Sequence, residues 1–276
     1  MAMRVASKGG MLILGLMTQD VALKKSKPAL LAEDEPGPVE LIVGDASLVI
    51  TGDHAGNLVP RALGNLGIPA GELGRHIGWD IGAAAVARLL AAELNATAVL
   101  ARYSRLIIDP NRPLGDPDCF PAVSDGTPIP ANAALSAEDI AARADAFYWP
   151  YHRAVDHQIA RLRAAGKPPV VLCMHSFTPA LSAREQARPW HIGVMFSYDD
   201  QLGRALIKGL QAEPGLVVGE NEPYSGFIHG YAQKLHGLAQ VLPHAQIEVR
   251  QDMIGDDAGQ AKWAKILARV LAPEIE

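Results

Sequence analysis

The sequence predicts an α/β domain whose mixed, mainly parallel β-sheet is sandwiched between helices. Short apolar runs rich in β-branched residues alternate along the chain with longer stretches that have helical spacing. Such alternation is typical of a mainly parallel sheet that is covered by helices on both faces. The chain has 276 residues, 49% of them hydrophobic, and no linker divides it, so one large core is expected.

The expected elements follow one another at short intervals. Runs rich in valine, isoleucine and leucine predict strands, and apolar residues three and four apart predict helices. Ser136 and Asp139 have the spacing of a capping box, and Pro150 should kink or divide the helical region that they open. In order, we expect a strand over 47–51, a helix over 81–94, a strand, turn and strand over 97–106, a long loop over 109–130, a helical region over 136–165, strands over 169–174 and 191–196, a helix over 201–210, a strand over 217–218, a helix over 231–242, a strand over 245–249 and a helix over 258–271.

Residues 1–38 mix basic, acidic and proline residues and predict a flexible N-terminal extension, which precedes a single catalytic domain over 39–276. Within the extension, Arg4 and Lys8 precede an apolar run over 11–17 that imitates a secretory signal. That run is at the short limit for a signal, and no Ala-x-Ala site follows it closely. No stretch reaches the ~18 apolar residues of a membrane span. We therefore expect a cytoplasmic protein without a membrane partner.

The charge balance does not favour a nucleic acid partner. Lysine and arginine number 25 against 30 acidic residues, which gives a net charge of -5, and no dense basic run marks a phosphate-binding face. Cys119 and Cys173 are too few for a disulfide framework and lack CxxC spacing. Cys173 lies in an apolar run and is expected to be a buried structural thiol.

Polar side chains stand at the ends of three predicted strands. His54 follows the first strand, His175 follows the central one, and Glu248 lies on a late one. If these strands are parallel neighbours, the three side chains converge at one edge of the sheet. Two histidines and a carboxylate are a common zinc set that leaves a fourth position for water, and a further carboxylate such as Glu248 could act as general base. Either histidine alone could equally be a hydrogen-bonded structural residue, and the scaffold could serve a binding protein without activity.

Asp80 and two arginines each admit two interpretations. Asp80 could cap the helix that follows it, or it could be a third metal ligand that shares a helix face with His76. Arg105 and Arg112 bracket a short strand and the start of the long loop. They could hold a substrate carboxylate through paired hydrogen bonds, or one of them could pair with Asp109.

Beyond single residues, an ordered series of motifs resembles the N-formylglutamate amidohydrolase family from about residue 47 to the C-terminus. The order and spacing of the motifs together make the likeness fairly specific. Enzymes of histidine breakdown in that family tend to show Pro-His-Ser-Gly where this chain has Asp53-His54-Ala55-Gly56, so the chain resembles a divergent subgroup. The matching motifs are Gly52-Asp53-His54-Ala55-Gly56-Asn57, Arg75-His76-Ile77-Gly78-Trp79-Asp80, Tyr103-Ser104-Arg105-Leu106-Ile107-Ile108-Asp109-Pro110-Asn111-Arg112-Pro113, Pro150-Tyr151-His152, His175-Ser176-Phe177-Thr178-Pro179, Arg188-Pro189-Trp190, Asn221-Glu222-Pro223-Tyr224-Ser225 and Ile247-Glu248-Val249-Arg250.

The resemblance implies a fold like that of zinc carboxypeptidases, with a divalent metal, zinc first, at the strand ends. It implies His54 and His175 as metal ligands and Glu248 as the general base. Carboxypeptidases have glutamate three residues after the first histidine, where this chain has Asn57, so Asp80 is the candidate for the third ligand.

The resemblance also implies the substrate, a small N-acylated acidic amino acid, with N-formylglutamate as the first candidate. An N-acetyl or N-succinyl group, or a peptide end, are the alternatives. The expected substrate-binding residues are Arg105, Asn111, Arg112, Ser176 and Arg188. The side chains expected to surround and orient these groups are Asp53, His76, His152, His236 and Arg250.

Overall fold

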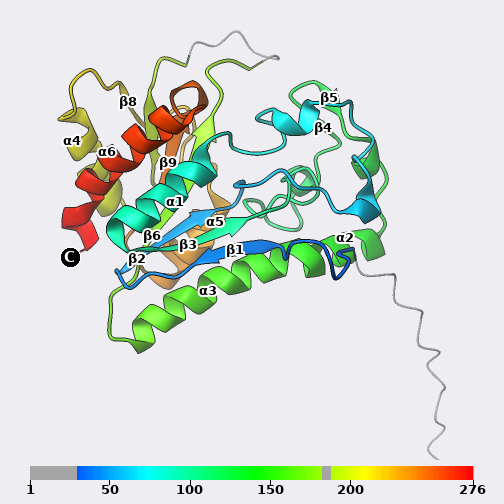
Figure 1. Ribbon diagram of the computed structural model, residues 1–276, viewed down its shortest axis with the longest axis horizontal. Coiled ribbons are helices and arrows are strands. Elements are labelled where there is room, and N and C mark those ends of the chain that lie inside the picture. The colour runs from blue at the N-terminus through cyan, green and yellow to red at the C-terminus, as the bar shows by residue number, and fades with distance from the viewer. Residues whose placement is uncertain (1–29, 182–187, 276) are drawn as a thin grey trace, which may run out of the picture.

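A seven-stranded mixed sheet forms the centre of the molecule (Figure 1). The computed structural model describes residues 30–181 and 188–275. The strands lie in the order β1-β3-β2-β6-β9-β7-β8, in which β3, β2, β6 and β9 are parallel, while β1 and β7 pair antiparallel with β3 and β9. The predicted mixed, mainly parallel sheet is therefore confirmed. The strands are β1 Val39–Ile42, β2 Leu48–Gly52, β3 Thr97–Ala101, β6 Val170–Phe177, β7 Ile192–Met195, β8 Val218–Glu220 and β9 His244–Arg250.

Helices cover both faces of this sheet, as Figure 1 shows with α1 and α6 on one side and α3 on the other. Successive side chains of a strand point to opposite faces, so Ile50 packs in a core with α1, α4 and α6, while Val49 packs in a second core with α3. Both strand residues are fully buried, which explains why the predicted strands read as continuous apolar runs. The helices are α1 Ala83–Leu94, α2 Ala137–Arg143, α3 Trp149–Ala164, α4 Gln201–Gln211, α5 Tyr231–His236 and α6 Asp257–Ile275.

The predicted helical region over 136–165 is divided as the position of Pro150 indicated. The capping box is present, because the Ser136 hydroxyl accepts from the Asp139 backbone and the Asp139 carboxylate accepts from the Ser136 backbone. A π-helical turn over Ala144–Tyr148 separates α2 from α3, and Pro150 occupies the first turn of α3, where a missing N–H costs least. From α3, Tyr151 reaches the Asp53 carboxylate after β2, while His152 contacts His236 of α5.

Two predicted elements are wrong in part. No second strand follows β3, because the Ser104 hydroxyl accepts from the Leu106 backbone and donates to the Gly78 carbonyl, which closes a turn. The helix expected over 231–242 ends at His236, since the chain tightens at Gly237, where any side chain would collide with the His244 ring.

The segment 109–130, which we expected to be a loop, contains a two-stranded hairpin of β4 Val123–Ser124 and β5 Thr127–Pro128. Asp125 and Gly126 form its turn with positive φ angles of 42° and 83°. Asp-Gly at a hairpin turn is a recognised signal, because both positions need left-handed backbone.

Residues 30–38, which we assigned to the flexible extension, pack against the domain. Leu30 and Leu31 contact a third apolar cluster beneath the loops, and the Tyr103 hydroxyl donates to the Pro36 carbonyl over 2.8 Å. The apolar run over 11–17 and the rest of the extension up to residue 29 lie outside the described residues. Among the helices that the structure describes, none is long and apolar enough to cross a membrane.

Candidate active site

A small polar cavity of about 150 Å³ opens at the carboxyl ends of β2, β6 and β9. His54, His175 and Glu248, predicted to converge there, all line it. The parallel register explains this, because His175 on β6 lies directly beside Glu248 on β9, and β2 delivers the chain to His54 from the other side of β6. Asp80 joins them from the loop before α1.

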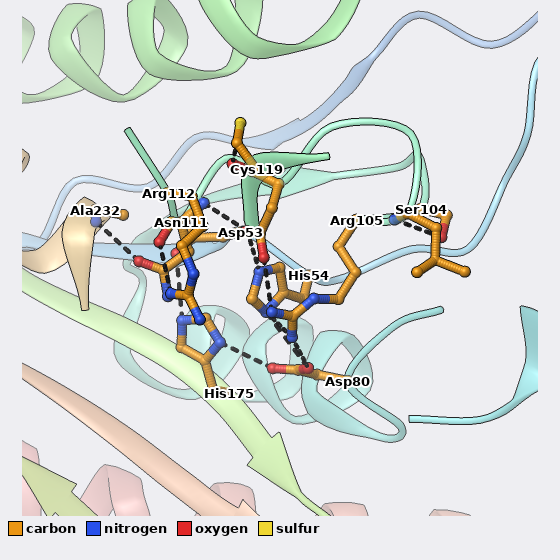
Figure 2. Close-up of polar contacts among 12 residues, drawn as sticks. Asp53, His54, Asp80, Ser104, Arg105, Asn111, Arg112, Cys119, His175 and Ala232 are labelled. Atoms are coloured by element: carbon orange, nitrogen blue, oxygen red, sulfur yellow. Dashed lines mark hydrogen bonds and ion pairs between the residues drawn. The ribbon is translucent and has the colours of Figure 1, made fainter. Parts of the chain in front are cut away.

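His54, Asp80 and His175 form a buried cluster in which one ligand atom of each lies within 4.8 Å of the others. Both oxygens of Asp80 are engaged, since Oδ2 lies 2.8 Å from Nδ1 of His175 and Oδ1 lies 3.5 Å from Nδ1 of His54. The two rings meet edge to face with centroids 5.0 Å apart, and Figure 2 shows them above the Asp80 carboxylate. Two imidazole nitrogens and one carboxylate oxygen are the ligand chemistry of a zinc site with an open position.

Two more carboxylates orient the histidines from behind. Oδ1 of Asp109 lies 2.7 Å from Nε2 of His54, and Oδ2 of Asp53 lies 3.3 Å from Nε2 of His175. The Tyr151 hydroxyl donates to Asp53 and fixes that carboxylate. A carboxylate that attracts the proton to Nε2 leaves a lone pair on Nδ1, which is the usual outer arrangement of histidine ligands. In His54 this Nδ1 faces Asp80 and lies 3.0 Å from the Arg105 guanidinium.

The electrostatics of this cluster favour a cation. Burial opposes the charged form of His175, yet the carboxylates of Asp53 and Asp80 raise its pKa well above the ordinary value. Burial also opposes ionisation of Asp80, but the two histidines hold its pKa far below its usual range. A buried group of carboxylates that draws protons onto neighbouring imidazoles offers a divalent ion the same negative environment.

Asp80 does not cap a helix, so the capping interpretation is wrong. Helix α1 begins at Ala83 after Gly82, whose φ of 80° no side chain favours, and its N-cap makes no side-chain hydrogen bond. No helix joins His76 to Asp80 either, although both line the cavity. The Asp80 carboxylate instead accepts from the Ser176 backbone over 3.2 Å, which holds it against β6.

Glu248 is buried in the lining of the cavity, and no cationic side chain among the described residues lies in hydrogen-bond contact with it. Its Oε1 accepts a 2.7 Å hydrogen bond from Nε2 of Gln246, two residues earlier on the same face of β9. Burial raises the pKa of Glu248 to about 7, with His175 opposing this shift and Asp80 adding to it. A carboxylate with a pKa near neutrality can both accept and return a proton, which a general base requires.

Arg105 and Arg112 both line the cavity, but they differ in their partners. Arg105 pairs with Asp109 over 2.7 Å. It also lies 3.0 Å from Nδ1 of His54, toward which it points in Figure 2. The pairing of Asp109 with one arginine, one of our two interpretations, is therefore correct. Arg112 donates to the Asn111 carbonyl and has no ion pair with any residue that the structure describes. Its guanidinium is free to bind an anionic ligand.

The other predicted contact residues lie in or beside the cavity. Asn111 and Ser176 line it, although their side chains also hold the protein together: Asn111 accepts from the Ala232 backbone, and the Ser176 hydroxyl donates to the Ile81 carbonyl. Arg188 does not line the cavity itself but contacts Tyr224, which does. Its guanidinium donates to the Tyr224 hydroxyl and lies over the Tyr224 ring.

Three residues expected around the site lie away from the cavity. His152 and His236 form a buried pair between α3 and α5, with Nδ1 of His152 2.8 Å from Nε2 of His236. Burial, with His236 beside it, lowers the pKa of His152 to about 4. Arg250 turns outward to Asp252 and to the Trp190 carbonyl.

Sequence comparison agrees with this geometry. The N-formylglutamate amidohydrolase family matches residues 46–255, which include every residue of the buried cluster and Glu248. The chain belongs to the N-formylglutamate amidohydrolase family. As a member of that family it is an amidohydrolase.

Two solved structures resemble this amidohydrolase over most of its length. The gene product Atu2144 from Agrobacterium tumefaciens is 34% identical, has a TM-score of 0.85, and is matched over 88% of this chain and 97% of its own. The N-formylglutamate amidohydrolase from Ralstonia eutropha JMP134 is 22% identical, has a TM-score of 0.65, and is matched over 87% of this chain and 98% of its own. The second likeness concerns the fold alone. No curated protein sequence matches this chain.

Several residues of the amidohydrolase site were not predicted from the sequence. Asp109 was considered only as an arginine partner, and Tyr151 only as part of a motif, although both support the cluster. Gln246, Tyr224 and His229 also line the cavity. The signal for Gln246 was present, since it lies two residues before Glu248 and so faces the same side of the strand.

Activity of this amidohydrolase should depend on pH through Glu248. A base acts only when ionised, so we expect kcat/KM to rise with pH and level off at high pH. A bound cation favours the carboxylate, so the midpoint should fall between the ordinary value of 4.5 and the value of about 7 set by burial. A kcat/KM profile over roughly pH 4 to 9 at saturating metal measures it. A profile flat across this range would contradict the role of Glu248.

Proposed function

We propose that this amidohydrolase uses a divalent metal, zinc first, to cleave the amide of an N-acylated acidic amino acid, with N-formylglutamate as the first candidate. The observation that carries the proposal is the buried cluster of His54, Asp80 and His175 beside Glu248 in one small polar cavity. The cavity volume of about 150 Å³ suits a small substrate. Membership of the family supports the same chemistry.

His54, Asp80 and His175 would hold the ion. When bound, such an ion acts as a Lewis acid and makes water a stronger nucleophile near neutral pH. Asp109, hydrogen-bonded to Nε2 of His54, and Asp53, 3.3 Å from Nε2 of His175, would favour the tautomer that presents Nδ1 to the cavity. These three ligands and two orienting carboxylates are the five buried ionisable side chains gathered at this end of the sheet.

Glu248 accepts the proton of the attacking water as its oxygen adds to the formyl carbon. The same carboxyl then returns that proton to the amide nitrogen as the carbon–nitrogen bond breaks, which releases formate and glutamate. Gln246 keeps the carboxylate in place through its 2.7 Å hydrogen bond. The substrate carboxylates would bind at Arg112, which has no ion pair among the described residues, and at Arg105, which also pairs with Asp109. Both residues line the same cavity, and guanidinium groups match carboxylate geometry.

Removal of the metal tests the proposal. Protein treated with a chelator should lose formate release from N-formylglutamate, and added zinc should restore it, because no other group in the site replaces a Lewis acid. Formate release and metal content are measured on the same samples. The proposal fails if chelated protein free of metal keeps its activity. Rapid cleavage of N-acetyl- or N-succinylglutamate with no cleavage of the formyl compound would keep the chemistry but replace the acyl group.

A further inference from the structure

A second cavity of about 410 Å³ adjoins the catalytic one and has no role in the chemistry above. Asn111, Arg112, His229 and Gly230 border both cavities. Sites for small ligands usually measure roughly 300–1,000 Å³. The catalytic cavity alone falls below that range, whereas the second cavity lies within it. The two together therefore offer room for a ligand longer than one acylated amino acid.

Gly230 lines both cavities where they adjoin. Its φ is 75°, and a side chain there would meet the amide oxygens of Gln233 and Gln246 at 3.0 Å. Gln246 lines the catalytic cavity, so a side chain at position 230 would crowd one of the residues of that lining. Glycine leaves bare backbone at this border. A ligand can lie across it without displacing a side chain of that residue.

The lining of the second cavity suits a group with a carboxylate. Arg112 and Lys234 have no ion-pair partner among the residues that the structure describes, and both line this cavity. An alkyl chain would cover these cations without pairing them, which costs free energy. Ile228 and Tyr231 add apolar surface, and Ile228 is left 76% exposed. Asp116 and Asp118 also line this cavity, but neither forms an ion pair with Arg112 or Lys234. Two unpaired cations beside apolar surface can therefore bind a further amino-acid residue through its free carboxylate.

We propose that the preferred substrate is an N-acylated acidic dipeptide, whose first residue occupies the catalytic cavity and whose second residue lies in the adjoining cavity with its carboxylate at Arg112 and Lys234. In such a dipeptide the α-carboxyl group of the first residue forms the peptide bond, so Arg112 binds the carboxylate of the second residue in its place. This inference rests on the proposed function and extends its substrate. The reaction is unchanged: water adds to the acyl carbon, the acyl carbon–nitrogen bond breaks, and the peptide bond between the two residues stays intact.

The test compares N-formylglutamate with N-formyl-glutamyl-glutamate on the zinc-loaded full-length protein. We expect kcat/KM for formate release to be on the order of tenfold higher with the longer substrate, the effect of one added charged contact. Lys234→Glu reverses the charge in the second cavity and should bring the ratio of the two kcat/KM values to one or below. Lys208→Glu on α4 makes the same change at an exposed position distant from both cavities, and it should keep the wild-type ratio.

Equal kcat/KM values for the two substrates in the wild-type protein would overturn the inference, as would an unchanged ratio in Lys234→Glu. If neither substrate releases formate, the proposed function fails, and binding of the unacylated ligands decides the inference instead. By titration calorimetry, glutamyl-glutamate should then bind about tenfold more tightly than glutamate to the wild-type protein, and no more tightly to Lys234→Glu. Equal affinities for the two ligands would refute the second site independently of catalysis.

Discussion

Replacing Glu248 with glutamine should lower kcat by about 100-fold or more while the bound metal is retained. Glutamine keeps the size of the side chain and the oxygen that accepts from Gln246, but it cannot accept a proton from water. Glu248 is not one of the three clustered ligands, so metal content should stay at the wild-type level. Steady-state kinetics and metal analysis on the same preparation measure both quantities. A kcat within about threefold of wild type would remove Glu248 from the role of base.

The same substitution should stabilise the metal-free protein at a pH above 7. The folded state raises the pKa of Glu248 from 4.5 to about 7, so the group contributes stability below pH 4.5 that is lost as the pH rises to 7. The difference between the two pKa values corresponds to a loss of at most about 3 kcal/mol in the free energy of unfolding at high pH. Glutamine carries no charge, so the variant does not lose this stability. Denaturant unfolding should show a larger gain at about pH 8 than at about pH 6. Glu220→Gln, at an exposed position on β8, is the control and should change neither kcat nor this pH dependence.

If Glu248→Gln lowers kcat and also raises the free energy of unfolding, Glu248 serves the reaction rather than the stability of the fold. Replacing a residue that has a structural role should lower the free energy of unfolding of the protein, because the contacts of that residue are lost. Glu248 has one hydrogen bond and no ion pair closer than 4 Å among the described residues, so its burial is costly in the fold. A loss of unfolding free energy in Glu248→Gln at about pH 8 would instead indicate that the carboxylate supports the fold.

The sequence predicted the sheet and the main site residues because both depend on local pattern. His54 and His175 were found at the ends of continuous apolar runs and Glu248 on a late strand, and parallel strands bring such positions to one edge of the sheet. Asp80 was ambiguous, since a single aspartate before a helix resembles a cap. Only the start of α1 at Ala83 and the contact of Asp80 with His175 decided the question.

The supporting residues could not be predicted because their partners are distant in the chain. Asp109 meets His54 across 55 residues, and Tyr151 meets Asp53 across 98. No spacing rule links such pairs before the topology is known. The hairpin at Asp125 was missed for another reason, because strands of two residues are too short to show alternation. Local patterns thus identified the polar groups that meet in the cavity, and the fold supplied the residues that contact them from behind.

Replacing His175 with alanine should remove the metal. His175 supplies one of the three ligand atoms in the cluster. Substituting residues that only orient the ligands typically lowers metal affinity 10–100-fold. Loss of a ligand itself should therefore lower metal affinity by about 100-fold or more. Competition with a coloured chelator measures the dissociation constant directly. His244→Ala is the matched control, because His244 is equally buried but lies at the opposite end of β9 and should leave metal affinity unchanged.

Loss of folding must be separated from loss of the ligand. Without the imidazole, the buried carboxylates of Asp53 and Asp80 lose a neighbour that carries positive charge, and breaking such a pair can cost roughly 3–5 kcal/mol. His175→Gln retains a hydrogen-bond donor near both carboxylates and should fold better than His175→Ala, but it lacks the imidazole nitrogen that binds zinc. A folded His175→Gln protein without metal therefore supports the ligand assignment. Full metal occupancy in that variant and in His54→Gln would refute the assignment, and with it the metal-dependent mechanism.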